Sequence, residues 1–153
     1  QLGCVFAGMS VADNVAYIPS QNVCGTVLTR QLEYKGEVID GYVYRLDLNR
    51  TTNGSIYAID LSTTELKWQT NLTDRIQSAS LIVSGGVLYS IDRSGVLYAI
   101  DIEDGSILTS IPFNAIGSAG PSIGADANGS MMLVFPIGGG TLTGNNPGII
   151  ISF

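Results

Sequence analysis

The sequence predicts an all-β fold made of repeated four-stranded antiparallel units, and three observations lead to this class. Glycines, 19 in all, alternate along the 153 residues with short runs of β-branched and aromatic residues, as expected for strands joined by turns. The run Gly54–Asp60 returns 41 residues later as Gly95–Asp101, with five of seven residues identical. No long heptad or 3.6-residue pattern is present, which argues against helices.

The period of 41 residues is typical of one four-stranded blade of a β-propeller. After each copy the chain turns and begins another strand, through Leu61–Trp68 in the first copy and Ile102–Thr109 in the second. Turns containing Gly, Asp or Ser separate the runs, which is the pattern of a hairpin meander. The strands expected within one period span residues 56–60, 66–70, 79–83 and 87–92.

Weaker copies flank the two clear ones. Val15–Pro19 resembles Val87–Ile91 one unit earlier, and an insertion at about 21–53 follows it. Near the other end, Gly129–Phe135 and Gly148–Phe153 have the composition of later strands. The pattern predicts about three blades, with a small domain of packed sheets as the alternative.

We therefore expect residues 1–153 to form a partial propeller, about three blades of an eight-bladed ring. Propellers close with 4–8 blades, and closure protects the edges of their sheets. The expected partners are thus the remaining blades of the same propeller or other copies of the chain.

The charge pattern excludes several classes of function. The net charge is −6, histidine is absent, and the seven Lys and Arg residues are scattered, whereas nucleic-acid binding needs a basic patch. No apolar run approaches the ~20 residues of a transmembrane helix. No histidine is available to activate a serine nucleophile. Gly138–Gly140 lacks the strand-to-helix context of an anion-binding loop, so a turn is favoured there.

Two features favour an extracellular or cell-surface setting with disulfides and glycans. Cys4 and Cys24 fit no metal motif, and a disulfide between them is favoured over two free buried thiols. Sequons for N-glycosylation fall where turns or loops are expected, which is where glycans are accommodated. The four sequons begin at Asn49, Asn53, Asn71 and Asn128.

Residues 58–68 resemble the tryptophan-docking motif of pyrroloquinoline-quinone (PQQ) dehydrogenases, Ala-x-Asp-x-x-Thr-Gly-Lys-x-x-Trp. The matching positions are Ala58, Asp60, Thr63 and Trp68, while Thr64 and Glu65 replace the Gly and Lys. In the second copy Ala99, Asp101 and Gly105 match, and Thr109 stands where the Trp is expected. The resemblance implies that the indole stacks between neighbouring blades. For Asp60 and Asp101 we expect a role in capping turns, rather than in catalysis.

The resemblance continues in order along nearly the whole chain. Met9–Asn22, Leu81–Tyr89 and Gly117–Gly140 are similar to successive stretches of those enzymes. The family also carries a long insertion after the first of these stretches. The resemblance therefore implies the C-terminal third of a quinoprotein-type propeller.

The departures from the family concern the quinone. An Asn-Trp pair that approaches PQQ in the family corresponds here to Val5 and Phe6. A Trp expected shortly before Leu81 is absent, with Ile76 and Gln77 near its place. The family's calcium ligands, catalytic Asp and vicinal disulfide lie in earlier blades. We therefore expect this segment to bind neither PQQ nor calcium by itself, unless the missing blades supply the site.

Three functions follow from the resemblance. The first is an extracytoplasmic enzyme that has lost PQQ, similar to the tetrathionate hydrolases of acidophiles. A low number of charged residues suits an acid setting, because only seven basic groups stay charged once carboxylates are protonated. A thermostable or glycosylated surface protein would have equally few charged residues. The alternatives are a PQQ-dependent alcohol dehydrogenase and a non-enzymatic propeller that serves as a surface scaffold, filament or assembly subunit.

Overall fold

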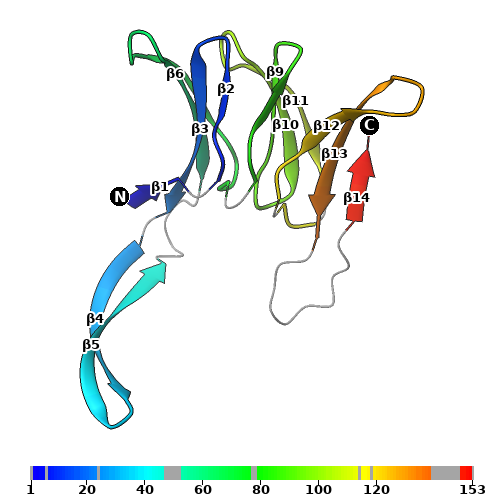
Figure 1. The fold of residues 1–153 in the computed structure, drawn as a ribbon. Coiled ribbons are helices and arrows are strands. Elements are labelled where there is room, and N and C mark those ends of the chain that lie inside the picture. The colour runs from blue at the N-terminus through cyan, green and yellow to red at the C-terminus, as the bar shows by residue number, and fades with distance from the viewer. Residues whose placement is uncertain are drawn as a thin grey trace.

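The computed structural model describes residues 2–5, 7–23, 25–46, 53–76, 79–113, 115–117, 119–138 and 149–152. These residues form fourteen strands and no helix, which confirms the all-β prediction. Three antiparallel sheets stand side by side, and a long two-stranded ribbon extends away from them (Figure 1).

The first sheet is a meander with one extra strand. Its order β2-β3-β6-β7 contains the first repeat, and β1 pairs with the other half of β3 on the same edge as β2. The register places Tyr17 opposite Ala58, and Ala58 opposite Trp68. The strands are β1 (Leu2–Cys4), β2 (Ser10–Ala12), β3 (Val15–Val23), β6 (Gly54–Asp60) and β7 (Leu66–Asn71).

The second sheet repeats this meander in the order β8-β9-β10-β11. Its third strand shifts register after Ala99, as the third strand of the first sheet does after Ala58. The sequence repeat therefore corresponds to a structural repeat of strand, turn and register shift. The strands are β8 (Ile82–Ser84), β9 (Val87–Ile91), β10 (Val96–Asp101) and β11 (Ile107–Pro112).

The third sheet consists of β12 (Ser122–Ala125), β13 (Met131–Ile137) and β14 (Ile149–Ser152) within the part of the chain that the structure describes. The strands that begin the three meanders, β2, β8 and β12, lie together, since β8 contacts both β2 and β12. We call the side where they gather the inner side. Strand direction alternates, so the described residues of the segments between sheets and of the turn after β9 lie at one end of the sheets, which we call the linker end. They are 72–76, 79–81, 92–95, 113, 115–117 and 119–121.

Two expected boundaries were wrong. Residues 21–23 were assigned to the insertion, but they continue β3, because Gln21 pairs with both Cys4 and Gly54. The strand expected at 79–83 begins only at Ile82, because Ala79 and Leu81 are buried in the segment that leads into β8.

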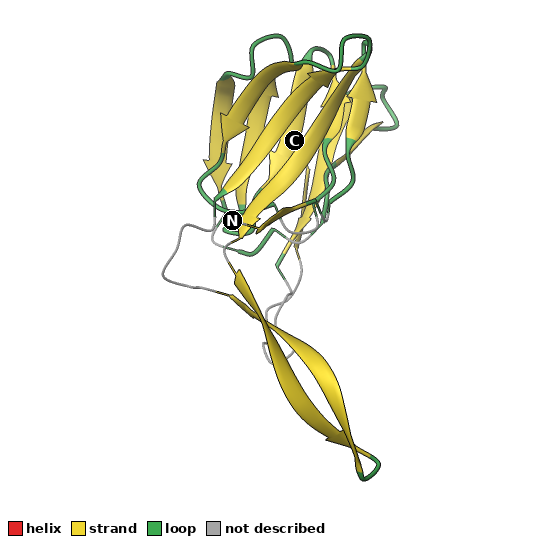
Figure 2. Cartoon of the chain, turned by 90° about the vertical axis from the view of Figure 1, so that its left-hand side faces the viewer, coloured by secondary structure: helices red, strands yellow, loops and turns green. Residues whose placement is uncertain are grey.

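Residues 25–46 form the ribbon, with β4 (Gly25–Tyr34) paired to β5 (Glu37–Leu46). Its tight turn places Lys35 and Gly36 at φ of 53° and 80°, a left-handed conformation that glycine adopts without strain. The ribbon projects from the linker end of the first sheet, away from all three sheets (Figure 2).

The core fills the spaces between the sheets. Because strand side chains alternate, one face of the first sheet packs on the second sheet and one face of the second on the third. Phe135 of the third sheet is fully buried and its ring centroid lies 5.1 Å from that of Phe113. The largest fully buried hydrophobic side chains are Tyr17, Ile56, Ile76, Leu88, Ile91, Ile100 and Phe135.

Candidate functional site

Trp68 docks the first sheet onto the second. The indole Nε1 donates a hydrogen bond to the carbonyl oxygen of Ile102, at 2.8 Å, in the turn that follows β10. Thr70 donates from Oγ1 to the carbonyl oxygen of Gly105 in the same turn. A Cβ at Gly105 would lie 2.6 Å from Trp68 Cδ2, and Gly105 has φ of 75°. Glycine is thus required there both by the turn and by the indole.

A small residue makes room for the indole within its own sheet. Ala58 is fully buried between Tyr17 and Trp68 in a cross-strand row. The two ring centroids are 5.7 Å apart, with planes tilted by 39°. The Ala of the motif therefore leaves space in which two aromatic rings pack together.

The aspartates that end β6 and β10 cap turns. Asp60 Oδ1 accepts from the backbone N–H groups of Ser62 and Thr63, at 2.7 and 3.0 Å. These backbone hydrogen bonds lower the pKa of Asp60 below its usual value. Asp101 Oδ1 accepts from Glu103 N at 2.8 Å in the equivalent turn.

The two capped turns match closely in backbone geometry. Thr64 has φ of 60° where Gly105 has 75°, so the replacement in the motif keeps the left-handed turn. In the second turn Asp104 accepts from Ser106 N, and this backbone hydrogen bond lowers the pKa of Asp104. Both turns lie at the end opposite the linker end; residues 61–65 of the first are exposed, as are Glu103 and Asp104 of the second, whereas Ile102 and Gly105 are buried.

A buried carboxylate, Asp92, ties the linker after β7 to the second sheet. Asp92 is fully buried, and its Oδ2 accepts from Thr73 Oγ1 and Tyr98 Oη, both at 3.0 Å. Its Oδ1 accepts from Ser94 Oγ at 2.7 Å and Val96 N at 3.0 Å. Burial is the main cause that raises the pKa of Tyr98. The carboxylate therefore organises the turn at 92–95 and holds the preceding linker against it.

We expect Asp92→Asn to lower the free energy of unfolding by roughly 1–3 kcal/mol, because an amide NH₂ would face the donor Asp74 N, which now reaches Oδ2 at 3.3 Å. Urea unfolding followed by circular dichroism measures this change. Asp126→Asn is the control, since Asp126 also accepts two backbone N–H bonds but in an exposed turn. A loss in the control as large as that in Asp92→Asn would contradict the assigned role.

At the linker end, the segments that lead into the three first strands converge on the inner side. Leu81 N donates to the carbonyl oxygen of Gly8 at 3.3 Å, and Ser10 Oγ donates to the carbonyl oxygen of Leu81. A Cβ at Gly8 would lie 2.8 Å from Ser80 Oγ, and one at Gly120 would lie 2.7 Å from Ser80 N. We call residues 7–10, 79–81 and 120–121 the inner floor. Small residues let three segments from different sheets meet there, and this is the candidate site.

The positions that correspond to the family's quinone contacts precede two segments of the inner floor in sequence, as Val5 and Phe6 come before residues 7–10 and Ile76 and Gln77 before residues 79–81. Val5 has a 49% exposed apolar side chain. Ile76 is 1% exposed and belongs to the core, so its side chain does not reach an open site. Phe6 and Gln77 lie outside the described residues. Sequence reasoning missed the floor itself, because only folding brings residues 8, 80 and 120 together.

Three of the four predicted glycosylation sites lie at exposed positions of the described residues. Asn53 and Asn128 are exposed, the first directly before β6 and the second in the turn at 126–130. Asn71 is exposed but is the last residue of β7, not part of a turn, and its Oδ1 accepts from Ser55 Oγ and Gln69 Nε2. Asn49 and Cys24 lie outside the described residues, as does the side chain of Cys4, so the disulfide stays a prediction.

The described residues hold neither a metal-binding cluster nor a membrane-spanning helix. No group of three or more Cys, Asp or Glu side chains that could hold a metal ion occurs among them. The described part of the chain also contains no helix long and apolar enough to cross a membrane.

No family model matches this chain. No curated protein matches it by sequence.

Solved structures do match, and they are propellers. A europium-containing methanol dehydrogenase is similar over 84% of this chain, with a TM-score of 0.70 and 14% identity. A quinohemoprotein alcohol dehydrogenase from Comamonas testosteroni is similar over 86%, with a TM-score of 0.66 and 17% identity. BamB from Moraxella catarrhalis is similar over 87%, with a TM-score of 0.52 and 19% identity.

These similarities show the fold. The chain has the architecture of a section of a β-propeller like that of the PQQ-dependent alcohol dehydrogenases, as the repeat and the docking motif predicted. It spans 23%, 22% and 30% of the length of these three structures, respectively. A chain of this length corresponds to one section of such a ring.

Proposed function

We propose that the chain contributes about three blades to an extracytoplasmic propeller enzyme of the quinoprotein-dehydrogenase type that works without PQQ. The observation that carries the proposal is at Val5, directly before the inner floor in sequence, which stands where the resembling family has a quinone-facing Asn. Val5 has a half-exposed apolar side chain that offers no hydrogen bond to a quinone. Ile76, near the place of a second expected contact, is part of the core.

The chemistry of the cofactor supports the same proposal. PQQ carries carboxylates and carbonyls that need hydrogen-bond partners when they are buried, and an unsatisfied buried group costs roughly 1–3 kcal/mol. Apolar side chains at these positions would leave such groups unpaired. Tetrathionate hydrolases are the example we have in mind of a quinone-free enzyme with this fold.

The low number of charged residues supports an acid, extracytoplasmic setting. Asp60 and Asp104 are capping carboxylates with a lowered pKa, so they stay ionised to lower pH than an ordinary aspartate. Their turns therefore keep a charged cap in acid. Four sequons and the predicted Cys4–Cys24 disulfide favour the same compartment.

A PQQ-dependent alcohol dehydrogenase is the second candidate, favoured by the TM-scores of 0.70 and 0.66 to two dehydrogenases. A non-enzymatic scaffold is the third, favoured by the similarity to BamB. In each case the remaining blades, or further copies, would complete the ring.

We expect no PQQ binding to the 153-residue chain at micromolar concentration, with calcium present, in an equilibrium dialysis experiment. The full-length protein should likewise give no dye-linked alcohol oxidation after incubation with PQQ and calcium, and should instead be assayed for tetrathionate hydrolysis. Micromolar or tighter binding to the chain alone would overturn the proposal. Quinone-dependent alcohol oxidation by the full-length protein would replace it with the dehydrogenase.

A further inference from the structure

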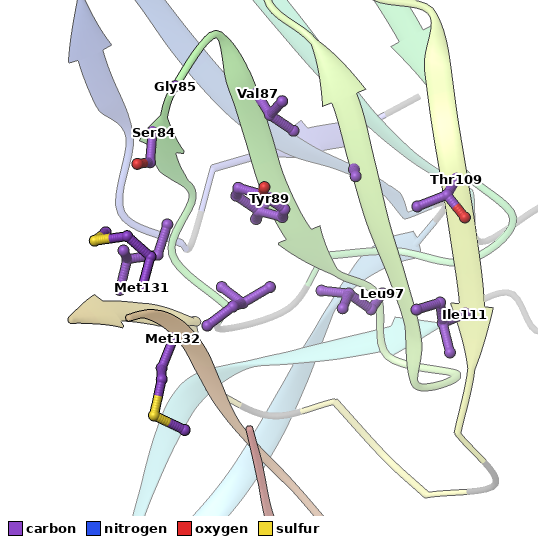
Figure 3. Close-up of a pocket in the computed structure, with 12 residues that line it drawn as sticks. Ser84, Gly85, Val87, Tyr89, Leu97, Thr109, Ile111, Met131 and Met132 are labelled. Carbon is purple, nitrogen blue, oxygen red and sulfur yellow. The ribbon is translucent and has the colours of Figure 1, made fainter. Parts of the chain in front are cut away.

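A cleft of about 540 Å³ opens between the second and third sheets. From the second sheet it is lined by Tyr89, Ala99 and Thr109, and from the third by Met131 and Leu133 (Figure 3). Its size lies within the usual range for small-molecule sites, which is ~300–1,000 Å³. Its lining is mostly apolar, with the hydroxyl groups of a few side chains between the apolar groups.

The cleft has a filled counterpart in the same chain. Tyr89, Ala99 and Thr109 form a cross-strand row in the second sheet. Tyr17, Ala58 and Trp68 form the equivalent row in the first. In the first row the small Ala leaves room for an indole that packs against the Tyr ring and docks onto the next sheet.

In the second row that room is kept, but the indole is missing. Ala99 is still small, and Tyr89 still stands across from it, but the outer position carries Thr109, which is exposed. A threonine side chain fills only a fraction of the volume of an indole. The cleft therefore occupies the position, between the second and third sheets, that the indole of Trp68 fills between the first and second sheets.

We propose that this cleft binds a free planar aromatic ligand of indole size. The ring packs against Tyr89 over Ala99, as Trp68 packs against Tyr17 over Ala58. Met131 and Leu133 cover its other side, where thioether–aromatic contacts are favourable. Apolar cavities left by a missing side chain bind small aromatic molecules of matching size. The proposal rests on the two junctions alone and does not depend on the proposed function.

The methionines provide the test, since the chain has three. Met131 and Met132 line the cleft, whereas Met9 is 58% exposed and lies directly before β2 of the first sheet. In the 153-residue chain labelled with ¹³C at the methionine methyl groups, titration with indole should shift the signals of Met131 and Met132. The shifts should saturate with a dissociation constant of roughly 1 mM or tighter, while the Met9 signal stays fixed.

Two variants separate the cleft from the rest of the surface. Thr109→Trp should fill the cleft with a side chain and abolish the indole-induced shifts. Ser110→Trp places the same side chain on the opposite face of β11, because strand side chains alternate, and should leave the shifts intact. The proposal is overturned if Met131 and Met132 do not move, if all three methionines shift together without saturation, or if Thr109→Trp still binds indole.

Discussion

Replacing Trp68 by Ala is expected to lower the free energy of unfolding by roughly 3–5 kcal/mol, the usual cost of removing a buried tryptophan. Trp68 is 8% exposed and packs against Tyr17 within its own sheet. It also packs on Gly105 and donates to Ile102 O in the next sheet. The substitution thus removes an aromatic pair, an inter-sheet hydrogen bond and the filling of a junction. Trp68 is the chain's single tryptophan, so its replacement removes the tryptophan fluorescence that could report unfolding. The change is therefore measured by urea unfolding followed by far-ultraviolet circular dichroism.

Two companion variants decide which part of the indole matters. Trp68→Phe keeps a ring against Tyr17 but loses the hydrogen bond to Ile102, so it should cost less than Trp68→Ala. Gln69→Ala is the matched control on the exposed face of the same strand, where substitutions change stability by about 0.5 kcal/mol or less. If Trp68→Ala and Gln69→Ala unfold at the same urea concentration, the indole does not hold the two sheets together.

The repeat explains why so much of the fold was predictable. Strand, turn and strand recur in Gly54–Trp68 and Gly95–Thr109 with the same register shift, so one motif described two sheets. Even the poorer copy at Val15–Pro19 lies in the second strand of its sheet, as Val87–Ile91 does. Local side-chain alternation and turn chemistry determine such elements, and both are visible in sequence.

Features that depend on long-range packing were not visible. Gln21 and Asn22 have the composition of a loop, but pairing with β1 and, for Gln21, with β6 as well keeps them in a strand. Gly8, Ser80 and Gly120 are far apart in the chain and carry no shared motif, so their meeting follows only from how the sheets stand together. The sequence did contain a signal for the cleft beside Thr109, because Thr109 stands where the docking motif has a Trp. The sequence alone did not show that the missing side chain leaves an open cleft.

The linker end depends on one glycine as strongly as the inter-sheet junction depends on Trp68. Gly95 follows the Asp92 turn with φ of 83°, and a Cβ there would lie 1.8 Å from the carbonyl oxygen of Ala115 and 2.6 Å from that of Phe113. Phe113 N also donates to Gly95 O at 2.8 Å, which holds the two backbones in contact. The segment after β11 can lie close to this turn only because Gly95 has no side chain.

We therefore expect Gly95→Ala to lower the free energy of unfolding by roughly 2–5 kcal/mol, the sum of left-handed strain and overpacking against a backbone. Gly129→Ala is a closely matched control, because Gly129 has φ of 82° with nothing within 4 Å of a built Cβ. It should show the strain alone, roughly 1–2 kcal/mol. Urea unfolding of both variants measures the difference, which isolates the steric contact with Phe113 and Ala115. Equal losses in the two variants would show that the backbone at Phe113 and Ala115 moves aside freely, and that Gly95 is needed only for its turn.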